Sequence, residues 1–477
     1  MTGATGSASP AAGAPDLCTR TAVDLASLLA RGEVSAAEVL DAHLDWIGQR
    51  NPALNAICTL DRDRARADAR AADDLRRRAP DDDAAKPLLG LPTAVKDLVP
   101  TKGIRTTFGS PIFADNVPDF DALIVERLRR AGAIVIGKTN TPEFGAGSQT
   151  FNPVFGKTRN PWDPSRTCGG SSGGAAAALA SGMLPIADGS DLGGSLRNPA
   201  SFCGVVGFRP TPGRVPRVPP EQGWDDLAVL GPMGRTVADA ALLFSVIAGP
   251  DARDPISLGP PATPFHPVEP ADLRGLRLAW TPNLGRYPVE REVVEICEAA
   301  LPVFRDLGAE VEEAAPDLSD ADSIFRTLRA NLFANKLGPL LADHRHQMKD
   351  TVIEEIERGL ALTGSDVAGA QAERTRLHCR VVDFFQLYDA LLLPTVQVLP
   401  FDIDRPYPTE IEGHVMSTYT DWMASCYSIT VTGCPAISVP LGVGPSRLPV
   451  GLQIVTTRRS DRMTLAIAAA FEAANGG

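Results

Sequence analysis

Residues 168–180 read Cys-Gly-Gly-Ser-Ser-Gly-Gly-Ala-Ala-Ala-Ala-Leu-Ala, a composition unlike most of the chain. Glycine- and serine-rich stretches are frequently flexible linkers. Here, however, the glycines run without a polar spacer into alanine, the strongest helix former. The segment therefore predicts a glycine loop that leads directly into a helix, with backbone N–H groups gathered at the positive end of the helix.

Two kinds of site use such a loop. A phosphate-binding loop requires Gly-Lys-Ser/Thr after its glycines, whereas Gly174 is followed by alanine, so a nucleotide site is not expected. The serine-hydrolase pattern G-x-S-x-G fits residues 169–173 loosely, with Ser171 at its centre. A Ser-His-Asp triad also needs a histidine base, and none of the downstream histidines has a sequence context that marks it as one.

A lysine can replace histidine as the base if burial lowers its pKa towards neutrality. Lys96 is a candidate because it lies in an apolar, strand-like run over residues 88–99. A lone lysine in a strand is usually exposed to solvent, so its position alone does not assign a catalytic role.

Strand and helix patterns alternate around this core. Residues 21–78 and 122–130 have helical spacing, and residues 133–137 form a short apolar strand. Further strands are expected at 276–280, 390–394, 436–439 and 451–455, with a longer helical region at 289–387 and a closing helix at 461–473. The pattern predicts an α/β fold, a single large domain over residues 16–477 with a central mixed β-sheet covered by helices on both faces. Residues 1–15 are expected to form a disordered tail.

The overall composition excludes several classes of protein. The net charge of −12 argues against a nucleic-acid surface and against binding to acidic membranes. No long apolar run predicts a transmembrane helix, and the N-terminus has no signal-peptide pattern. The eight cysteines are scattered without a CxxC pair, which is typical of reduced thiols in a cytoplasmic protein. The close pair His344 and His346 lies in a polar stretch and is interpreted as helix surface rather than a metal site.

Four stretches together resemble the amidase signature family: Gly90-Leu-Pro-Thr-Ala-Val-Lys-Asp97, Gly169-Gly-Ser-Ser-Gly-Gly174, Asp191-Leu-Gly-Gly-Ser-Leu-Arg197 and Phe202-Cys-Gly-Val-Val-Gly-Phe-Arg-Pro-Thr211. Residues 53–56, 231–239 and 448–453 also look like family stretches, so the resemblance covers nearly the whole chain. Several separate motifs in the right order make a specific signal, which a chance linker does not produce.

The resemblance implies a role for each of three residues. Lys96 matches the family's base, Ser171 its bridging serine and Ser195 its nucleophile. A cis peptide bond is expected between Gly170 and Ser171. In this sequence Ser190 stands where threonine is frequent in the family, a departure that does not touch the proposed proton path.

The loop around Ser195 is expected to support the reaction. An oxyanion hole would be formed by the backbone N–H groups of Leu192, Gly193, Gly194 and Ser195. Asp191 and Arg197 flank the nucleophile and are expected to pair and brace the loop; the alternative is a surface salt bridge that contributes little, about 0–1 kcal/mol.

The expected function is that of a stand-alone amidase that cleaves aryl or alkyl amides and anilides, and possible further substrates are esters and carbamates (urethanes). The small residues Gly145, Gly147 and Ser148 are expected to line the acyl pocket, with the region 289–387 and the stretch Tyr419 to Tyr427 as the other wall. No metal or cofactor is needed, and the partners are a small-molecule amide and water, with the chain a monomer or homodimer. One alternative is the glutaminase subunit of a tRNA-dependent amidotransferase; another is a non-catalytic relative, which the intact Lys96, Ser171 and Ser195 disfavour.

Overall fold

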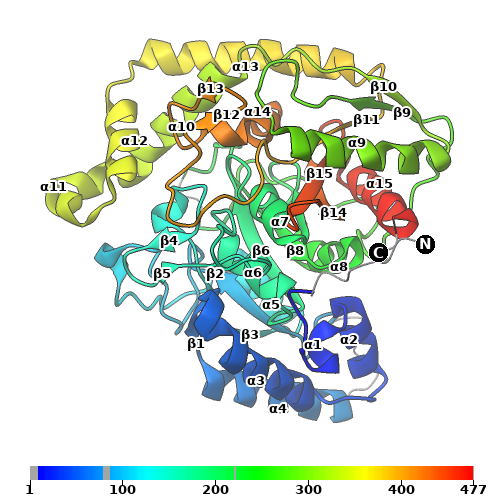
Figure 1. Cartoon of the computed structure of the whole chain (residues 1–477). Coiled ribbons are helices and arrows are strands. Elements are labelled where there is room, and N and C mark those ends of the chain that lie inside the picture. The colour runs from blue at the N-terminus through cyan, green and yellow to red at the C-terminus, as the bar shows by residue number, and fades with distance from the viewer. Residues whose placement is uncertain (1–8, 79–85, 220–221, 476–477) are drawn as a thin grey trace.

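A mixed eight-stranded sheet runs through the molecule, which we describe from a computed structural model that covers residues 9–78, 86–219 and 222–475 (Figure 1). Its strand order is β10-β9-β11-β15-β14-β7-β8-β6. The bounds are β6 Ile186–Asp191, β7 Val206–Arg209, β8 Val229–Gly234, β9 Arg277–Trp280, β10 Glu310–Glu313, β11 Ala390–Pro394, β14 Ala436–Val443 and β15 Pro449–Val455. The strands β10, β9 and β11 are parallel, and the others pair antiparallel.

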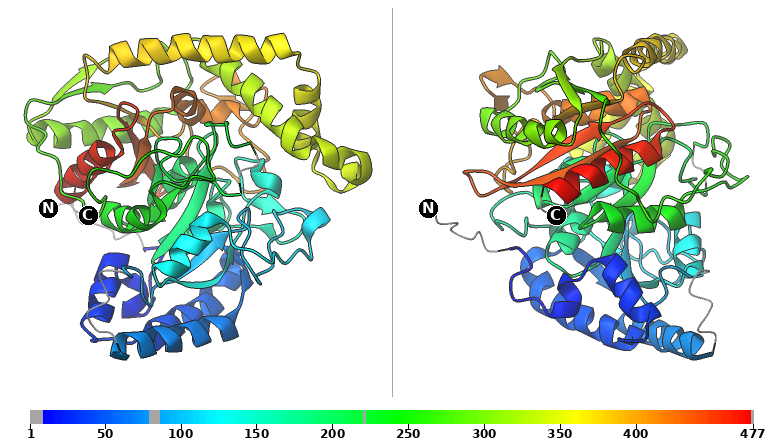
Figure 2. Two further views of the ribbon diagram at one scale, coloured as in Figure 1. Left: turned by 180° about the vertical axis from the view of Figure 1, so that it is seen from behind. Right: turned by 90° about the vertical axis from the view of Figure 1, so that its right-hand side faces the viewer.

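The longer helices lie around this sheet and extend beyond it at both ends of the molecule. They are α2 Ala22–Ala30, α3 Ala36–Leu54, α4 Arg62–Arg78, α5 Leu123–Arg130, α6 Gly173–Ala180, α7 Arg197–Cys203, α8 Val237–Ile247, α9 Arg291–Asp306, α10 Ala321–Leu337, α12 Asp350–Leu360, α13 Gly364–Phe384, α14 Ala424–Thr432 and α15 Asp461–Ala474. The short helices α1 Asp16–Thr19 and α11 Leu341–His344 complete the set. The N-terminal helices α1–α4 and the helix α13 lie at opposite ends of the molecule (Figure 2).

Side chains that alternate along the strands divide the interior into two large apolar clusters. In β11, Leu392 packs into one cluster, whereas its neighbours Leu391 and Leu393 pack into the other, as the two-residue period of a strand requires. The first cluster includes α8, α9 and α15, and the second includes α10, α13 and α14. The mixed sheet with helices on both faces confirms the predicted α/β architecture.

A smaller, three-stranded sheet in the order β1-β3-β2 carries the Lys96 motif (Ile57–Leu60, Ile134–Thr139 and Pro92–Lys96). The strands β2 and β3 are parallel, and β1 pairs antiparallel with β3. The expectation of continuous helical structure over 21–78 is wrong at this point, because β1 separates α3 from α4. Its four residues, Ile-Cys-Thr-Leu, are too few to show a strand period inside a helical pattern.

Helix α6 begins directly after the glycine-rich loop, as its sequence predicts, and every one of its residues is buried. The two glycines at its start permit a very close approach to neighbouring backbone. A Cβ atom at Gly174 would lie 2.3 Å from the backbone nitrogen of Asn140 and 2.6 Å from the carbonyl oxygen of Ala56. Glycine is therefore required here for α6 to dock against the segments that flank the small sheet.

Two other regions differ in part from expectation. The region 289–387 is mainly helical, but it also contains the strand β10, which is parallel to β9. Of the tail expected over residues 1–15, residues 1–8 lie outside the described part of the chain. Residues 9–15 are described and are partly held in place, for example by the bond from Arg50 Nη2 to the Pro10 carbonyl at 3.5 Å.

Candidate active site

Lys96 is the last residue of β2, and its side chain is fully buried. Its Nζ atom lies 2.8 Å from Ser171 Oγ, 2.8 Å from Ser172 Oγ and 2.9 Å from Ser190 Oγ. An ammonium group donates three hydrogen bonds, whereas a neutral amine donates two and accepts one through its lone pair. The three serine hydroxyl groups can each donate or accept, so they can satisfy both the charged and the neutral form of the Lys96 amine.

The environment of Lys96 favours loss of its proton near neutral pH. Burial lowers the pKa of Lys96 to about 7, although the carboxylates of Asp188 and Asp191 act in the opposite direction. A substantial fraction of the amine is therefore neutral at pH 7, which a general base at this pH requires.

Ser171 lies in the loop before α6, and the peptide bond between Gly170 and Ser171 is cis, as the resemblance implies. Two contacts join this loop to the segment that carries Ser195. The backbone N–H of Gly170 donates to Asn198 Oδ1 at 3.0 Å, and the N–H of Ser172 donates to the carbonyl of Ser195 at 3.3 Å. The two serine motifs thus form one structural unit.

The turn that carries Ser195 connects β6 to α7 and is organised by the carboxylate of Asp191. This carboxylate accepts bonds from the N–H groups of Gly194 at 2.9 Å and Leu196 at 3.2 Å. It also accepts from Arg197 Nη2 at 2.9 Å and from Arg209 Nη1 at 3.2 Å. Burial disfavours the charged form of Asp191, but the two guanidinium groups outweigh it and hold the pKa of this carboxyl well below its usual range.

The pair formed by Asp191 and Arg197 has no exposed side-chain surface, so the alternative of a surface salt bridge is wrong. Arg197 also donates to Gln453 Oε1 at 2.6 Å and to Thr430 Oγ1 at 2.9 Å. These partners lie on β15 and α14, so the pair fixes the Ser195 turn to the centre of the sheet.

One of the four expected oxyanion donors is already engaged. The N–H of Gly194 points to Asp191 Oδ1, which makes it part of the support of the turn. The candidate donors that lie next to the pocket are consequently Leu192, Gly193 and Ser195, and all three residues line it.

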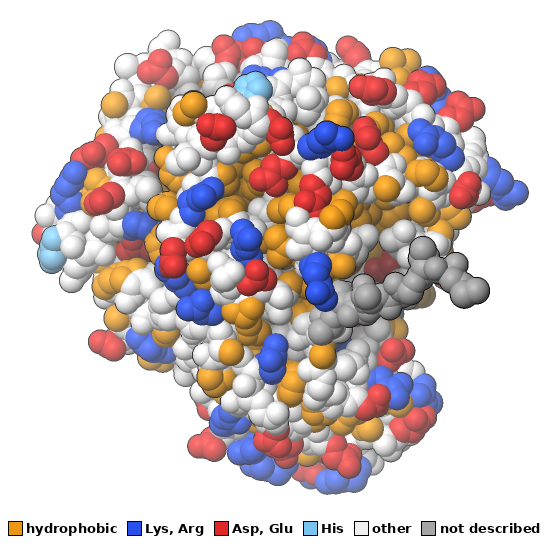
Figure 3. Space-filling model, viewed as in Figure 1, with side chains coloured by type: hydrophobic (Ala, Val, Ile, Leu, Met, Phe, Trp, Pro, Cys, Tyr) orange, Lys and Arg blue, Asp and Glu red, His pale blue; other side chains and the backbone are white. Residues whose placement is uncertain are grey.

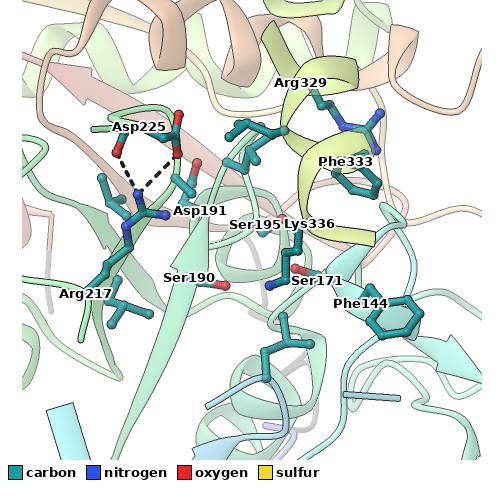
Figure 4. Close-up of a pocket in the computed structure, with 18 of the residues that line it drawn as sticks. Phe144, Ser171, Ser190, Asp191, Ser195, Arg217, Asp225, Arg329, Phe333 and Lys336 are labelled. Atoms are coloured by element: carbon teal, nitrogen blue, oxygen red, sulfur yellow. Dashed lines mark hydrogen bonds and ion pairs between the residues drawn. The ribbon is translucent and has the colours of Figure 1, made fainter. Parts of the chain in front are cut away.

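A cavity of about 260 Å³ opens over the serines (Figure 4). Ser171, Ser190 and Ser195 lie at its base, with α10 above them. Most of the wall is apolar, formed chiefly by Leu98, Val99, Phe144, Leu230, Phe325, Leu332, Phe333, Leu337 and Met423. At one side Arg217 and Asp225 form an ion pair at 3.2 Å, and Lys336 extends from α10 towards the serines.

The expected pocket walls are found in part. Gly145, Gly147 and Tyr419 all line the cavity. Ser148 is buried and is not among the lining residues; its hydroxyl donates to the Tyr419 carbonyl at 3.2 Å and accepts from Trp422 Nε1 at 2.8 Å. Within the region 289–387, the cavity is lined by α10 alone, because α10 is the helix that crosses above the serines.

Several residues of the site were not identified from the sequence. Ser172 and Ser190 both contact the Lys96 amine, and Arg209 is the second cation on Asp191. Ser172 adjoins Ser171, and Ser190 directly precedes the Asp191–Arg197 motif, so their proximity to the motif serines was the available signal. The expectation that the departure at Ser190 does not touch the proton path is wrong, because the Ser190 hydroxyl lies 2.9 Å from the Lys96 amine. Arg209 also lies in a motif, but its spacing from Asp191 does not reveal that the neighbouring strands β6, β8 and β7 bring the two together.

Comparison with known proteins agrees with this geometry. A family model described as Amidase matches residues 38–465. The chain belongs to the amidase signature family. It is 38% identical over 456 residues to the acylamidase of Rhodococcus erythropolis, with 95% of each chain covered. It is 36% identical over 488 residues to a subunit of the glutamyl-tRNA(Gln) amidotransferase of Acidothermus cellulolyticus, with 96% of this chain and 95% of the relative covered.

The crystal structure of a bacterial aryl acylamidase of the amidase signature family is similar throughout, with a TM-score of 0.89 and 30% identity over 95% of this chain and 96% of that one. This amidase signature chain is accordingly an amidase, a hydrolase that acts on carbon–nitrogen bonds. Within the described residues, no three His, Cys, Asp or Glu side chains come together as a possible metal site. Over the same ranges, none of the helices has the length and apolar character to cross a membrane.

Proposed function

We propose that this chain is a stand-alone amidase that cleaves its substrate through an acyl-enzyme on Ser195. The observation that carries the proposal is the contact of the buried Lys96 amine with Ser171 Oγ at 2.8 Å, at the base of the cavity that Ser195 also lines. This arrangement supplies a base, a hydroxyl that can relay protons, and a nucleophile that faces the substrate space.

In the proposed reaction, neutral Lys96 accepts a proton from Ser171, which takes one from Ser195 as that hydroxyl attacks the acyl carbon. The reverse transfer protonates the leaving amine, and water then releases the acyl group by the same relay. The negative charge that develops on the carbonyl oxygen is stabilised by the N–H groups of Leu192, Gly193 and Ser195. One such donor contributes about 3–4 kcal/mol of transition-state stabilisation in comparable sites.

The walls of the cavity favour an apolar acyl or leaving group. Phe144, Phe325 and Phe333 line the cavity, and Gly145 lies close to Ser171, since a Cβ atom there would be 3.5 Å from Ser171 Oγ. We therefore propose aryl and alkyl amides and anilides as the preferred substrates, and esters and carbamates (urethanes) as further substrates, since the same acyl transfer cleaves all of them.

A panel of substrates tests this specificity on the purified chain. We expect release of 4-nitroaniline from 4-nitroacetanilide and of an aromatic amine from an N-aryl carbamate, at rates above that of ammonia from free glutamine. Activity confined to glutamine would refute the proposed substrate class.

A second candidate is the glutaminase subunit of a tRNA-dependent amidotransferase, because relatives named as amidotransferase subunits reach 36–38% identity over nearly the whole chain. That function requires partner subunits and tRNA, whereas a stand-alone amidase acts by itself. Turnover of simple amides by the isolated chain favours the first proposal; inactivity that is relieved only by partner subunits favours the second.

We also propose that the enzyme works in the cytoplasm, as a monomer or homodimer, without a metal or organic cofactor. All eight cysteines are unpaired, which supports a reducing compartment. The reaction scheme uses side chains of this chain alone, so chelators such as EDTA should leave the rate unchanged. The oligomeric state is measurable by light scattering.

A further inference from the structure

Asp188 is a buried carboxylate next to Lys96 that the proposed proton relay does not use. It lies on β6 and is 1% exposed. Its Oδ1 atom accepts the backbone N–H of Lys96 at 3.0 Å, so it links the last residue of β2 in the small sheet to the edge strand of the large one. Within the described residues, its second oxygen, Oδ2, is buried and has no hydrogen-bond partner.

A second buried lysine also acts on the charge of this carboxylate. Lys138 of β3 is fully buried, and its Nζ atom donates to the Val99 carbonyl at 2.5 Å and to Thr101 Oγ1 at 2.8 Å. Burial raises the pKa of the Asp188 carboxyl, and the positive charges of Lys138 and Lys96 act in the opposite direction, towards a lower pKa. Asp97 accepts a hydrogen bond from the Thr107 hydroxyl at 2.5 Å. Its negative charge favours the protonated form of Lys138, whereas burial lowers the pKa of that lysine.

We propose that Asp188 is a positioning residue of the active site that acts through Lys96, fixing the backbone of the lysine with one oxygen and providing a buried counter-charge to its amine. The inference rests on the proposed role of Lys96 as the base. A buried carboxylate with one oxygen that accepts no hydrogen bond from the described residues keeps its charge available to the two buried lysines.

The counter-charge matters because two effects oppose each other at Lys96. Burial lowers the pKa of the amine, and the two aspartates, Asp188 and Asp191, raise it. The hydroxyls of Ser171, Ser172 and Ser190, which hydrogen-bond the amine, carry no charge. The cation of Lys336 extends from α10 towards these serines and is unchanged in the variants proposed below. Asp191 is already neutralised by Arg197 and Arg209, so Asp188 is the carboxylate whose removal changes the field at Lys96 most.

The variant Asp188→Asn tests the charge separately from the hydrogen bond, since the amide oxygen can still accept from the Lys96 N–H. Loss of the charge should lower the pKa of Lys96 and make the amine a weaker base. We expect the acidic limb of the pH profile of kcat/KM, measured with 4-nitroacetanilide, to move to lower pH by about one unit. The plateau rate should fall severalfold. A profile with an unmoved acidic limb would overturn the proposal.

Two further variants separate this role from a structural one. Asp188→Ala removes both functions, so its acidic limb should move as in Asp188→Asn while its plateau rate falls further. Asp239 is the matched control, because it too is a buried aspartate whose Oδ1 accepts a backbone N–H, that of Val23 at 3.1 Å, and whose Oδ2 has no partner among the described residues. Asp239→Asn should retain the wild-type profile. An equal shift in Asp239→Asn would overturn the proposal.

A measurement without an amide substrate keeps this inference distinct from the proposed function. A fluorophosphonate forms a bond from Ser195 Oγ to phosphorus and releases fluoride, and intact-mass spectrometry follows the rate at each pH. A shifted labelling profile in Asp188→Asn supports the role of Asp188 even if anilides are not cleaved. An unshifted labelling profile refutes it, whereas a wild-type enzyme that is not labelled at Ser195 refutes the proposed function itself.

Discussion

Ser195 is the residue whose replacement most directly tests the reaction. Ser195→Ala removes the proposed nucleophile but leaves the support of its turn, which comes from Asp191, in place. We expect kcat on 4-nitroacetanilide to fall by roughly 10⁴-fold or more, because members of such a catalytic unit act together. The midpoint of urea unfolding should stay at the wild-type value.

Ser181→Ala is the matched control for this prediction. Ser181 is also a buried serine, but it lies at the end of α6 and donates to the Ala177 carbonyl at 2.6 Å, away from the pocket lining. It should keep wild-type kcat. A Ser195→Ala enzyme with a tenth of the wild-type rate would contradict the assigned nucleophile.

The pH dependence of the reaction follows from Lys96. Burial lowers the pKa of its amine to about 7, so the neutral base is depleted as the pH falls below that value. We expect kcat/KM to decrease tenfold per pH unit on the acidic side and to level off above about pH 8. Lys96→Ala should lose most activity and lack this inflection. An inflection that persists in Lys96→Ala would assign it to another group.

The sequence could predict the identity of the three principal residues but not the complete contacts of the base. Lys96, Ser171 and Ser195 lie in motifs, and the structure brings Lys96 and Ser171 into hydrogen-bond contact. The contacts with Ser190 and Asp188 depend on how β6 lies beside β2. That arrangement is a tertiary feature without a local pattern, which is why these two residues were not recognised as neighbours of the base.

At the scale of the elements, α6 offers a test of the close approach that its glycines permit. Gly174→Ala would place a Cβ atom 2.3 Å from the Asn140 backbone nitrogen, a contact that requires backbone movement. We expect the variant to lose about 1–3 kcal/mol of unfolding free energy, measured by urea denaturation, as overpacked sites do. Activity should also fall, because α6 follows directly on the loop of Ser171.

The control for this prediction is Gly364→Ala at the start of α13. A Cβ atom there meets nothing within 4 Å, and alanine has the higher helix propensity. The unfolding free energy of this variant should therefore be unchanged or slightly higher. If both variants had the same stability, the close packing of α6 would not be the reason for its glycines.

The elements were predicted well where their patterns are long or strongly apolar. The strand expected at 390–394 is β11, and α15 matches the expected closing helix within one residue. The short strands β1 and β10 were missed, since β1 has four residues within a helical stretch and β10 is largely exposed. Strands of that kind are stabilised by their partner strands rather than by their own sequence.

At the scale of the whole molecule, the active site lies where the two sheets meet. The small sheet provides Lys96, the edge of the large sheet provides Asp188 and Ser190, and α10 closes the cavity above them. The order of the strands around this junction was not predictable, because neighbours in the sheet come from distant parts of the chain.

The surface beyond the site carries charges of both signs, interspersed on the face shown in Figure 3.

The network around Asp191 holds this arrangement together, because it connects β6 and β7 with α7 and, through Arg197, with α14 and β15. Asp191→Asn leaves two fully buried guanidinium groups without their anion. Breaking a buried pair in this way costs about 3–5 kcal/mol, so we expect a loss of that size in the unfolding free energy measured with urea.

The effect of Asp191→Asn should also depend on pH in a defined direction. The pKa of Asp191 is lowered on folding, so its charge stabilises the native state above the pKa of the unfolded chain and less as the pH falls towards the folded value. The stability difference between wild type and variant should therefore shrink on acidification below about pH 4. The exposed pair of Arg291 and Glu295 provides the control, and Glu295→Gln should cost less than about 0.5 kcal/mol. Equal losses in the two variants would show that the buried network contributes no more to stability than an exposed ion pair does.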